Sequence, residues 1–132
     1  MRFLLDTSMC VFALRGHAGT AVRLGRVAGA DIAVSVITVA ELWVGVRKSR
    51  EAEVRGMALA AFLAPFPVLP FDARAADHYV ETRCALEAAG QPIGERDLII
   101  AATALSHGLT VATNNIREFG RVPGLRVEDW SR

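Results

Sequence analysis

The chain alternates short apolar runs with longer stretches of helical periodicity, and this alternation restricts its fold more than any other feature. Short runs rich in β-branched residues predict strands that are buried on both faces. Strands separated by helices pair in parallel, because a parallel crossover needs a connection of helix length. We therefore expect an α/β fold. The expected strands are residues 2–5, 31–35, 68–69, 109–112 and an edge strand at 126–127.

The stretches between these runs have the composition and the boundaries of helices. Thr7 and Ser8 can cap the first helix, and Pro65 and Gly108 are typical of helix ends. The polar residues that follow the fourth apolar run predict a turn. The expected helices are residues 9–14, 21–27, a helix from 37 to about 47, then 51–63, 72–89 and 97–107.

The size and composition indicate one globular domain, residues 1–132, with 52% hydrophobic and 22% charged residues. Asp6 comes too early for a signal peptide, and the apolar stretch 32–46 is interrupted by polar residues, so we expect a cytoplasmic protein with no membrane contact. Cys10 and Cys84 lack metal-ligand spacing and are expected as buried free thiols. The histidines form no zinc pattern.

Net charge does not decide whether the chain binds nucleic acid. The net charge of +1 lacks the basic signature of many nucleic-acid-binding proteins, although a carboxylate site would cancel basic residues elsewhere. Lys48 is the one lysine among 15 basic residues. Arginine suits bidentate contacts to phosphate, but coding bias explains the same preference.

Three acids stand where a parallel sheet would gather them. Asp6 follows the first strand, Glu41 lies on the helix after the second strand, and Asp97 begins a later helix. Ligands bind beyond the carboxyl ends of the strands in open parallel sheets. We therefore expect these acids to converge at one edge of the sheet, together with the segment 115–118.

Each acid also has an interpretation without chemistry. Asp6 and Asp97 can simply cap the helices that follow them. Glu41 has almost only apolar neighbours in the sequence, so its carboxylate needs a partner, a proton or a metal ion. Arg47 lies off the helical face of Glu41, which leaves arginines elsewhere in the chain as candidate partners.

A cluster of carboxylates makes chemical sense around a divalent ion. Mg²⁺ takes oxygen ligands and retains waters, so it can orient a water and stabilise charge on a phosphodiester. Without an ion, the acids would repel each other and a phosphodiester backbone. Two other phosphoryl-transfer classes fit poorly. A haloacid-dehalogenase-like phosphatase needs an Asp where Ser8 stands, and a response-regulator receiver needs a late lysine, which this chain lacks.

Four segments, in order, resemble the motifs of the PIN-domain family and, within it, of the VapC toxins of bacterial toxin–antitoxin pairs. The resemblance implies a PIN-like three-layer α/β/α domain. It also implies an endoribonuclease dependent on Mg²⁺ or Mn²⁺, in which the catalytic and metal-binding acids are Asp6, Glu41 and Asp97. The segments are residues 3–8, 35–42, 92–104, and 111–119 continuing through 123–130.

The resemblance implies partners as well. The closing segment resembles VapC toxins that cut initiator tRNA in the anticodon loop, which makes tRNA the expected RNA substrate. A cognate VapB-like antitoxin would occlude the site, and the chain would form a homodimer and a toxin–antitoxin hetero-oligomer that binds operator DNA only through the antitoxin. The alternative is a catalytically silent PIN fold that serves as a protein-interaction module.

The chain departs from the family pattern at two positions. Ser8 stands where relatives usually have Asn, and Asn115 stands where many have Asp, with Glu118 the nearest acid. Asn115 and Glu118 are candidates for a fourth ligand position, Asn115 through its carbonyl oxygen or a water, although either can be a cap or a solvated residue. Thr113 and Ser8 are candidates for hydrogen bonds to the acids. Arg96 is either a contact to an RNA phosphate or an ordinary surface arginine.

Overall fold

The structure, a computed structural model, describes residues 1–132 and centres on a parallel sheet. The strands are β1 (Phe3–Leu5), β2 (Ile32–Ser35), β3 (Val68–Leu69), β4 (Thr110–Thr113) and β5 (Val127–Asp129). They form one five-stranded sheet in the order β3-β2-β1-β4-β5, and every neighbouring pair is parallel. The expected parallel sheet is therefore confirmed, including the position of β5 at its edge.

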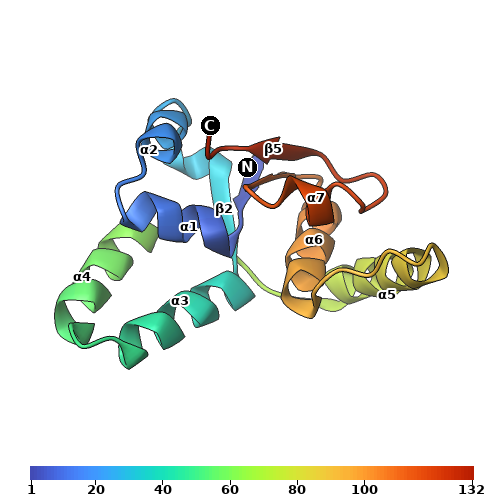
Figure 1. The fold of residues 1–132 in the computed structure, drawn as a ribbon, viewed down its shortest axis with the longest axis horizontal. Helices are drawn as coiled ribbons and strands as arrows, with labels where there is room; N and C mark the ends of the chain where they lie inside the picture. Colours follow the sequence, from blue (N-terminus) through green and yellow to red (C-terminus); the bar gives the residue numbers. More distant parts are fainter.

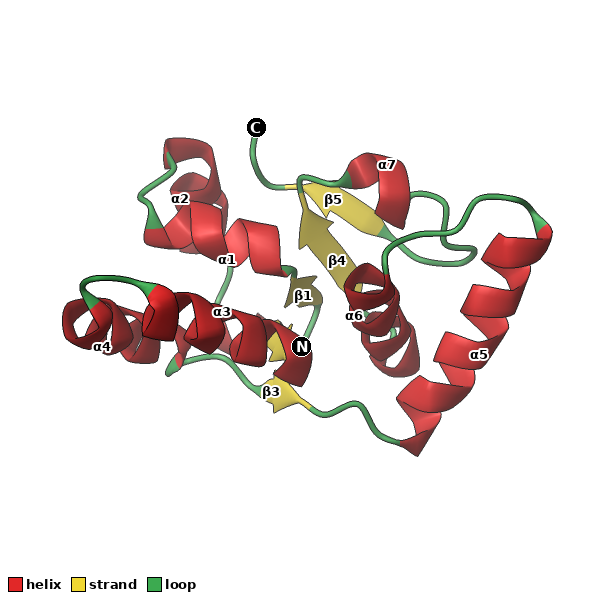
Figure 2. Ribbon diagram, turned by 60° about the horizontal axis from the view of Figure 1, so that its bottom comes forward, coloured by secondary structure: helices red, strands yellow, loops and turns green.

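Helices cover both faces of this sheet. They are α1 (Thr7–Leu14), α2 (Ala18–Gly25), α3 (Val36–Lys48), α4 (Ala52–Leu63), α5 (Ala73–Ala88), α6 (Glu95–His107) and α7 (Ile116–Phe119). Figure 1 shows α1 to α4 on one side of the sheet and α5 and α6 on the other. The strands lie between these two layers in the turned view of Figure 2. This three-layer α/β/α arrangement confirms the expected PIN-like fold.

The apolar runs in the sequence are explained by two hydrophobic clusters, one on each face of the sheet. Successive residues of a strand point to opposite faces. Leu4 accordingly belongs to the cluster beneath α5 and α6, whereas Phe3 and Leu5 belong to the cluster beneath α1, α3 and α4. Trp130, which is 1% exposed, packs against Phe3 with 5.0 Å between the ring centroids. A strand covered on both faces needs apolar residues at every position.

The observed boundaries differ from the predicted ones mainly at helix starts. Helix α2 begins at Ala18 rather than 21, because the side chain of His17 accepts a hydrogen bond from the backbone N–H of Thr20. Helix α6 begins at Glu95 rather than 97. Helix α7 was not predicted, because four residues are too few for a periodic pattern.

The prediction that both cysteines are buried is wrong for one of them. Cys10 is fully buried, but Cys84 is exposed on α5. Apolar sequence neighbours do not bury a residue whose helical face points to solvent.

The strand order creates a crevice at the carboxyl end of the sheet. The chain builds β1, β2 and β3 in one direction across the sheet and then returns to add β4 and β5 on the other side of β1. The end of β1 lies directly beside β4, where the backbone N–H of Asp6 donates to the carbonyl of Ala112 at 3.1 Å. Ligands of parallel sheets bind at such a reversal of strand order.

No helix has the length and apolar character needed to cross a membrane.

Candidate active site

Asp6 lies at the carboxyl end of β1 and is only 3% exposed. Its Oδ1 accepts a hydrogen bond from the backbone N–H of Met9 at 2.9 Å, which caps α1, and its Oδ2 accepts one from the hydroxyl of Thr113. The sequence left open whether Asp6 is a cap or a cleft residue, and it is both. Burial raises the pKa of Asp6, while the hydrogen bonds from Thr113, Met9 and Ser8 oppose that rise.

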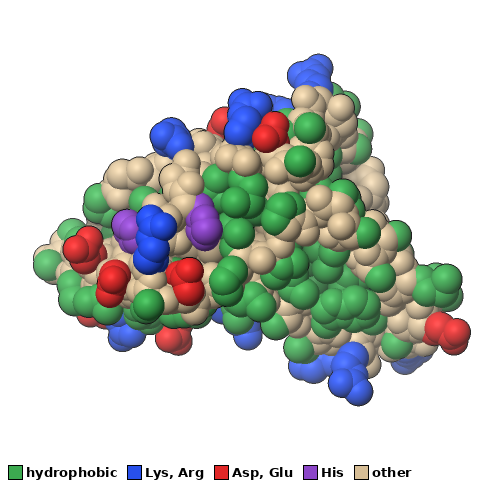
Figure 3. Space-filling view, turned by 180° about the vertical axis from the view of Figure 1, so that it is seen from behind, with side chains coloured by type: hydrophobic (Ala, Val, Ile, Leu, Met, Phe, Trp, Pro, Cys, Tyr) green, Lys and Arg blue, Asp and Glu red, His purple; other side chains and the backbone are tan.

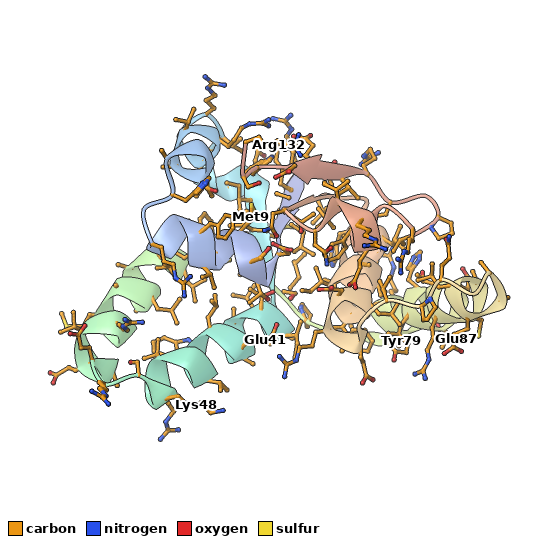
Figure 4. The ribbon with its side chains drawn as sticks, viewed as in Figure 1. Met9, Glu41, Lys48, Tyr79, Glu87 and Arg132 are labelled. Atoms are coloured by element: carbon orange, nitrogen blue, oxygen red, sulfur yellow. The ribbon has the colours of Figure 1, made fainter.

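Glu41 comes from the second turn of α3 and faces Asp6 across the end of the sheet. Figure 4 shows it near the first turns of α3, at the middle of the molecule. Its Oε1 accepts from the Thr7 hydroxyl at 2.9 Å, and its Oε2 accepts from Nη1 of Arg96 at 2.8 Å. The Glu41 side chain is 17% exposed. The partner that its apolar sequence neighbours required is thus an arginine from α6, which only the fold brings near.

Asp97 lies in the first turn of α6, and the interpretation of this residue as a helix cap is wrong. Gly94 occupies the N-cap position and makes no side-chain capping bond, since the helix begins two residues before Asp97. Burial raises the pKa of Asp97 to about 7, with further contributions from neighbouring Glu118 and from the charge of Asp6. The hydrogen bond with Asp97 lowers the pKa of Glu118. In the absence of a cation, burial and the neighbouring carboxyl group therefore favour protonation of Asp97 over protonation of Glu118.

The turn after β4 fixes the acids in place. Thr113 is fully buried, and its oxygen accepts from the backbone N–H of Asn115 at 2.8 Å while its hydroxyl donates to Asp6. The side-chain amide of Asn115 donates to Asp97 at 3.2 Å and to Glu118 at 3.3 Å. Without an ion, the amide nitrogen of Asn115 faces these two carboxylates, and the role of Asn115 as a ligand through its carbonyl oxygen or a water stays a prediction.

The sequence analysis missed three polar residues near the acids: Thr7, Thr38 and Asn114. They contact the acids directly or through Thr7 and the predicted residue Ser8. Ser8 Oγ lies 2.9 and 3.0 Å from the two Asp6 oxygens and 2.8 Å from Oδ1 of Asn114. Thr7 Oγ1 lies 3.1 Å from Oγ1 of Thr38 in addition to its bond to Glu41. Thr7 and Asn114 each adjoin a predicted site residue in the sequence, which is a signal that could have identified them. Thr38 had no such signal.

The predicted acids line a single cleft of about 1040 Å³. Ser8, Asn115 and Arg96 line it too, whereas Thr113 and Glu118 support it from outside the lining. The lining comprises Asp6, Thr7, Ser8, Ile37, Glu41, Gly94, Glu95, Arg96, Asp97, Ile99, Asn114 and Asn115. Segments far apart in the sequence thus meet where the reversal of strand order predicts a ligand site.

The donor set of the cleft fits a hydrated hard cation. No three acidic, histidine or cysteine side chains are close enough to enclose an ion directly. Mg²⁺ is typically held by one or two carboxylates and retains several waters, so carboxylates spaced around a cleft suit it. The donors are oxygen atoms, which favour Mg²⁺ or Mn²⁺ over zinc. Asp6 and Asp97 both have pKa values raised chiefly by burial, with repulsion from other acids adding to the shift, and a bound cation would favour their charged forms.

A parallel α/β/α domain with acids at the carboxyl edge of its sheet defines a class of protein, and comparison with known families identifies it. The model of the family described as PIN domain matches residues 3–125, and the chain belongs to the PIN domain family. Within that family its relatives are VapC proteins. The Shigella flexneri protein named tRNA(fMet)-specific endonuclease VapC is 37% identical over 131 residues, which cover 99% of each chain.

Solved structures of VapC complexes have the same fold. A chain of VapBC2 from Rickettsia felis, bound to a DNA fragment from their promoter, superposes with a TM-score of 0.91 at 38% identity, covering 98% of this chain and 99% of that one. A chain of DNA-bound VapBC from Salmonella typhimurium gives a TM-score of 0.93 at 37% identity, covering 98% of both. The resemblance read from the four sequence motifs is therefore confirmed over nearly the whole chain.

Proposed function

We propose that this protein is a VapC-type ribonuclease toxin, a metal-dependent endoribonuclease that inhibits translation by cleaving RNA. The observation that carries the proposal is the cleft at the carboxyl edge of the sheet, where acids from three separate segments of the chain meet: Asp6, Glu41 and Asp97. The Mg²⁺ or Mn²⁺ dependence of this activity is part of the proposal.

Different residues of this cleft would bind the ion, position its ligands and add negative charge. Asp6 and Asp97 would hold the ion, with Thr113 and Asn115 fixing their carboxylates by hydrogen bonds. Glu41 adds negative charge to the same cleft from α3. A bound divalent ion would supply a more acidic water and would stabilise charge on the phosphodiester during attack.

The substrate we propose is tRNA, cut in the anticodon loop of the initiator species. The support is the full-length similarity to the Shigella flexneri protein, whose name specifies tRNA(fMet). A cleft of about 1040 Å³ has room for a flipped nucleotide with its flanking phosphates, which fits a single-stranded loop better than a duplex.

We further propose that a VapB-like antitoxin binds this chain, that the chain forms a homodimer, and that the assembly reaches operator DNA through the antitoxin. The DNA-bound VapBC structures support this assembly by similarity. Hydrophobic side chains gather in the middle of the face drawn in Figure 3, as expected of a protein that associates with partners. The large apolar residues exposed on the chain include Val36, Val44, Val54, Met57, Val68 and Val80.

The test is cleavage of purified initiator and elongator tRNA by the purified protein. We expect cuts in the initiator anticodon loop with Mg²⁺ or Mn²⁺, no cuts in excess EDTA, and recovery when the ion is restored. Asp97→Asn should slow cleavage by about 10²-fold or more. Asp77→Asn, which neutralises an exposed acid on α5 outside the cleft, is the matched control.

The outcomes separate the proposal from its alternative. Cleavage that persists in excess chelator, or that proceeds at the wild-type rate in Asp97→Asn, would refute the assignment of the site. A protein that neither cuts RNA nor binds Mn²⁺ in calorimetric titration would instead be the catalytically silent interaction module.

A further inference from the structure

Arg96 is the only basic residue among those that line the cleft, and it is bound to one of the acids. The lining also contains the acids Asp6, Glu41, Glu95 and Asp97. A cleft with four acids and one base repels a polyanion unless the balance of charge changes. Arg96 is therefore the one side chain of the cleft lining whose charge attracts an RNA phosphate.

The contact that occupies Arg96 is of a kind that breaks easily. Its Nη1 lies 2.8 Å from Oε2 of Glu41, but the Arg96 side chain is 73% exposed. The free energy of this ion pair is limited on the arginine side, because water solvates the exposed guanidinium when the contact opens and the long side chain regains freedom, whereas the Glu41 side chain is only 17% exposed. The backbone of Arg96 is fixed in the first turn of α6, so only its side chain would move on release.

Glu41 can serve either the guanidinium or a cation in the cleft. A divalent ion held by Asp6 and Asp97 would repel the Arg96 guanidinium and attract the Glu41 carboxylate. Glu41 would keep its place during the exchange, because Thr7 holds its other oxygen at 2.9 Å. A released arginine next to Asp97 presents donors in a fork that matches a phosphate group.

We propose that Arg96 is an exchangeable phosphate-binding residue, which neutralises Glu41 in the metal-free protein and binds an RNA backbone phosphate once a divalent ion has taken its place. This inference rests on the proposed function, because it requires both the ion and the RNA. It assigns to the first turn of α6 a role in coupling metal binding to substrate binding.

The first arm of the test is calorimetric titration of the metal-free protein with Mn²⁺. Arg96→Gln should bind Mn²⁺ about two- to fivefold more tightly than the wild type, because the ion no longer displaces a guanidinium. Arg23→Gln is the matched control, since Arg23 pairs with Glu128 at 3.7 Å outside the cleft. Its Mn²⁺ affinity should equal that of the wild type.

The second arm measures binding of a fluorescein-labelled RNA hairpin by anisotropy, in Ca²⁺ and in EDTA, with a gel to show that the RNA stays intact. Arg96→Gln should weaken binding about two- to tenfold in Ca²⁺ and should change it little in EDTA, where Glu41 already holds the arginine. In a plot of the logarithm of the RNA binding constant against the logarithm of the salt concentration, the magnitude of the slope should fall by about one in Ca²⁺ only.

The results distinguish the two proposals. Unchanged Mn²⁺ affinity in Arg96→Gln, or an equal loss of RNA affinity with and without the ion, would overturn the exchange while the ribonuclease assignment stands. If the wild type does not bind Mn²⁺, the metal-dependent function itself fails. Binding of Mn²⁺ that Asp6→Asn abolishes and Arg96→Gln strengthens, together with a loss of RNA affinity in Ca²⁺ only, is the combination that supports both.

Discussion

Asp97 lies between two other carboxyl groups. Glu118 is within hydrogen-bonding reach, and Asp6 is close enough to add repulsion. Burial and these neighbours raise the pKa of Asp97 from its ordinary 3.8 to about 7, so the folded metal-free protein favours the protonated acid below about pH 7. Ionisation of Asp97 in the folded protein therefore lowers the free energy of unfolding by an amount that depends on pH.

We expect Asp97→Asn to stabilise the metal-free protein increasingly as the pH rises. A raised pKa gives stability that is complete below about pH 3.8 and is lost as the pH rises toward about 7. The melting temperature of Asp97→Asn in EDTA should therefore match that of the wild type near pH 4 and exceed it by about 2–5 °C at pH 7.5, with solvent screening limiting the gain.

Calorimetric melts between pH 4 and pH 8 measure this difference, with Asp77→Asn as the control that should show none. Saturating Mg²⁺ should reduce or reverse the difference, because an ion that binds only the folded wild type stabilises it. A difference in melting temperature that does not change with pH would mean that folding does not raise the pKa of Asp97.

Among single residues, the sequence predicted the acids and the hydroxyl partners Thr113 and Ser8, but not the arginine that pairs with Glu41. Asp6 and Glu41 could be found because each acid directly follows or interrupts an apolar run. The ion pair between Glu41 and Arg96 spans 55 positions, and no local pattern relates the two. The direction in which the Asn115 amide points was also undecidable, since it depends on carboxylates that come from other segments.

At the scale of elements, strand β4 links the edge of the sheet to the acids. Its last residue, Thr113, donates to Asp6 and accepts from the backbone N–H of Asn115. Both contacts are buried or half-buried, so the hydroxyl satisfies groups that have little access to water. The end of one strand thereby holds both the residue at the end of its neighbour and the following turn.

Thr113→Val should lower the free energy of unfolding by about 1–2 kcal/mol and should reduce RNA cleavage, because it leaves the buried Asp6 carboxylate with one donor fewer. Thr110→Val at the other end of β4 is the matched control. Thr110 accepts from an exposed arginine, Arg126, away from the cleft, so its loss should leave cleavage unchanged. Urea unfolding and tRNA cleavage measure the two effects. Equal cleavage by the two variants would argue against this role for Thr113.

Elements were predictable where their own sequence carried the pattern. The buried strands β1, β2 and β4 have apolar residues on both faces, and the glycine at the end of α6, Gly108, adopts the left-handed conformation with a φ of 64°. The start of α6 was misplaced because Gly94 caps it without a side-chain signal. Helix α7 is one turn that tertiary contacts hold, which no periodicity can reveal.

At the scale of the whole molecule, the two hydrophobic clusters share the strands that separate them. Leu4 and Ala33 face one cluster, while their sequence neighbours Leu5 and Val34 face the other. If the strands unfolded, the apolar side chains of both clusters would be exposed to water together. Size and composition predict one domain over residues 1–132, and this sharing of strands leads to the same expectation.

We therefore expect a single unfolding transition in urea. Tryptophan fluorescence, to which Trp43 on α3 and Trp130 in the cluster beneath α1, α3 and α4 both contribute, should change together with far-UV circular dichroism, which reports all helices. The free energy of unfolding should fall by about 2 kcal/mol for each molar increase in urea concentration, as is usual for small domains. Two separated midpoints, measured at several protein concentrations, would show that the two layers fold independently.

The sequence by itself determined the class of fold and the three acids, because strand periodicity, helix boundaries and an acid at a strand end are local properties. The tertiary structure decided which strands are neighbours, and hence that the ends of β1 and β4 adjoin and open a cleft between α3 and α6. It also decided the partners of each acid: Thr113 for Asp6, Arg96 for Glu41, and Asn115 for Asp97. These pairings arise from the order of strands in space, which burial and chain crossover set and which no short segment of sequence contains.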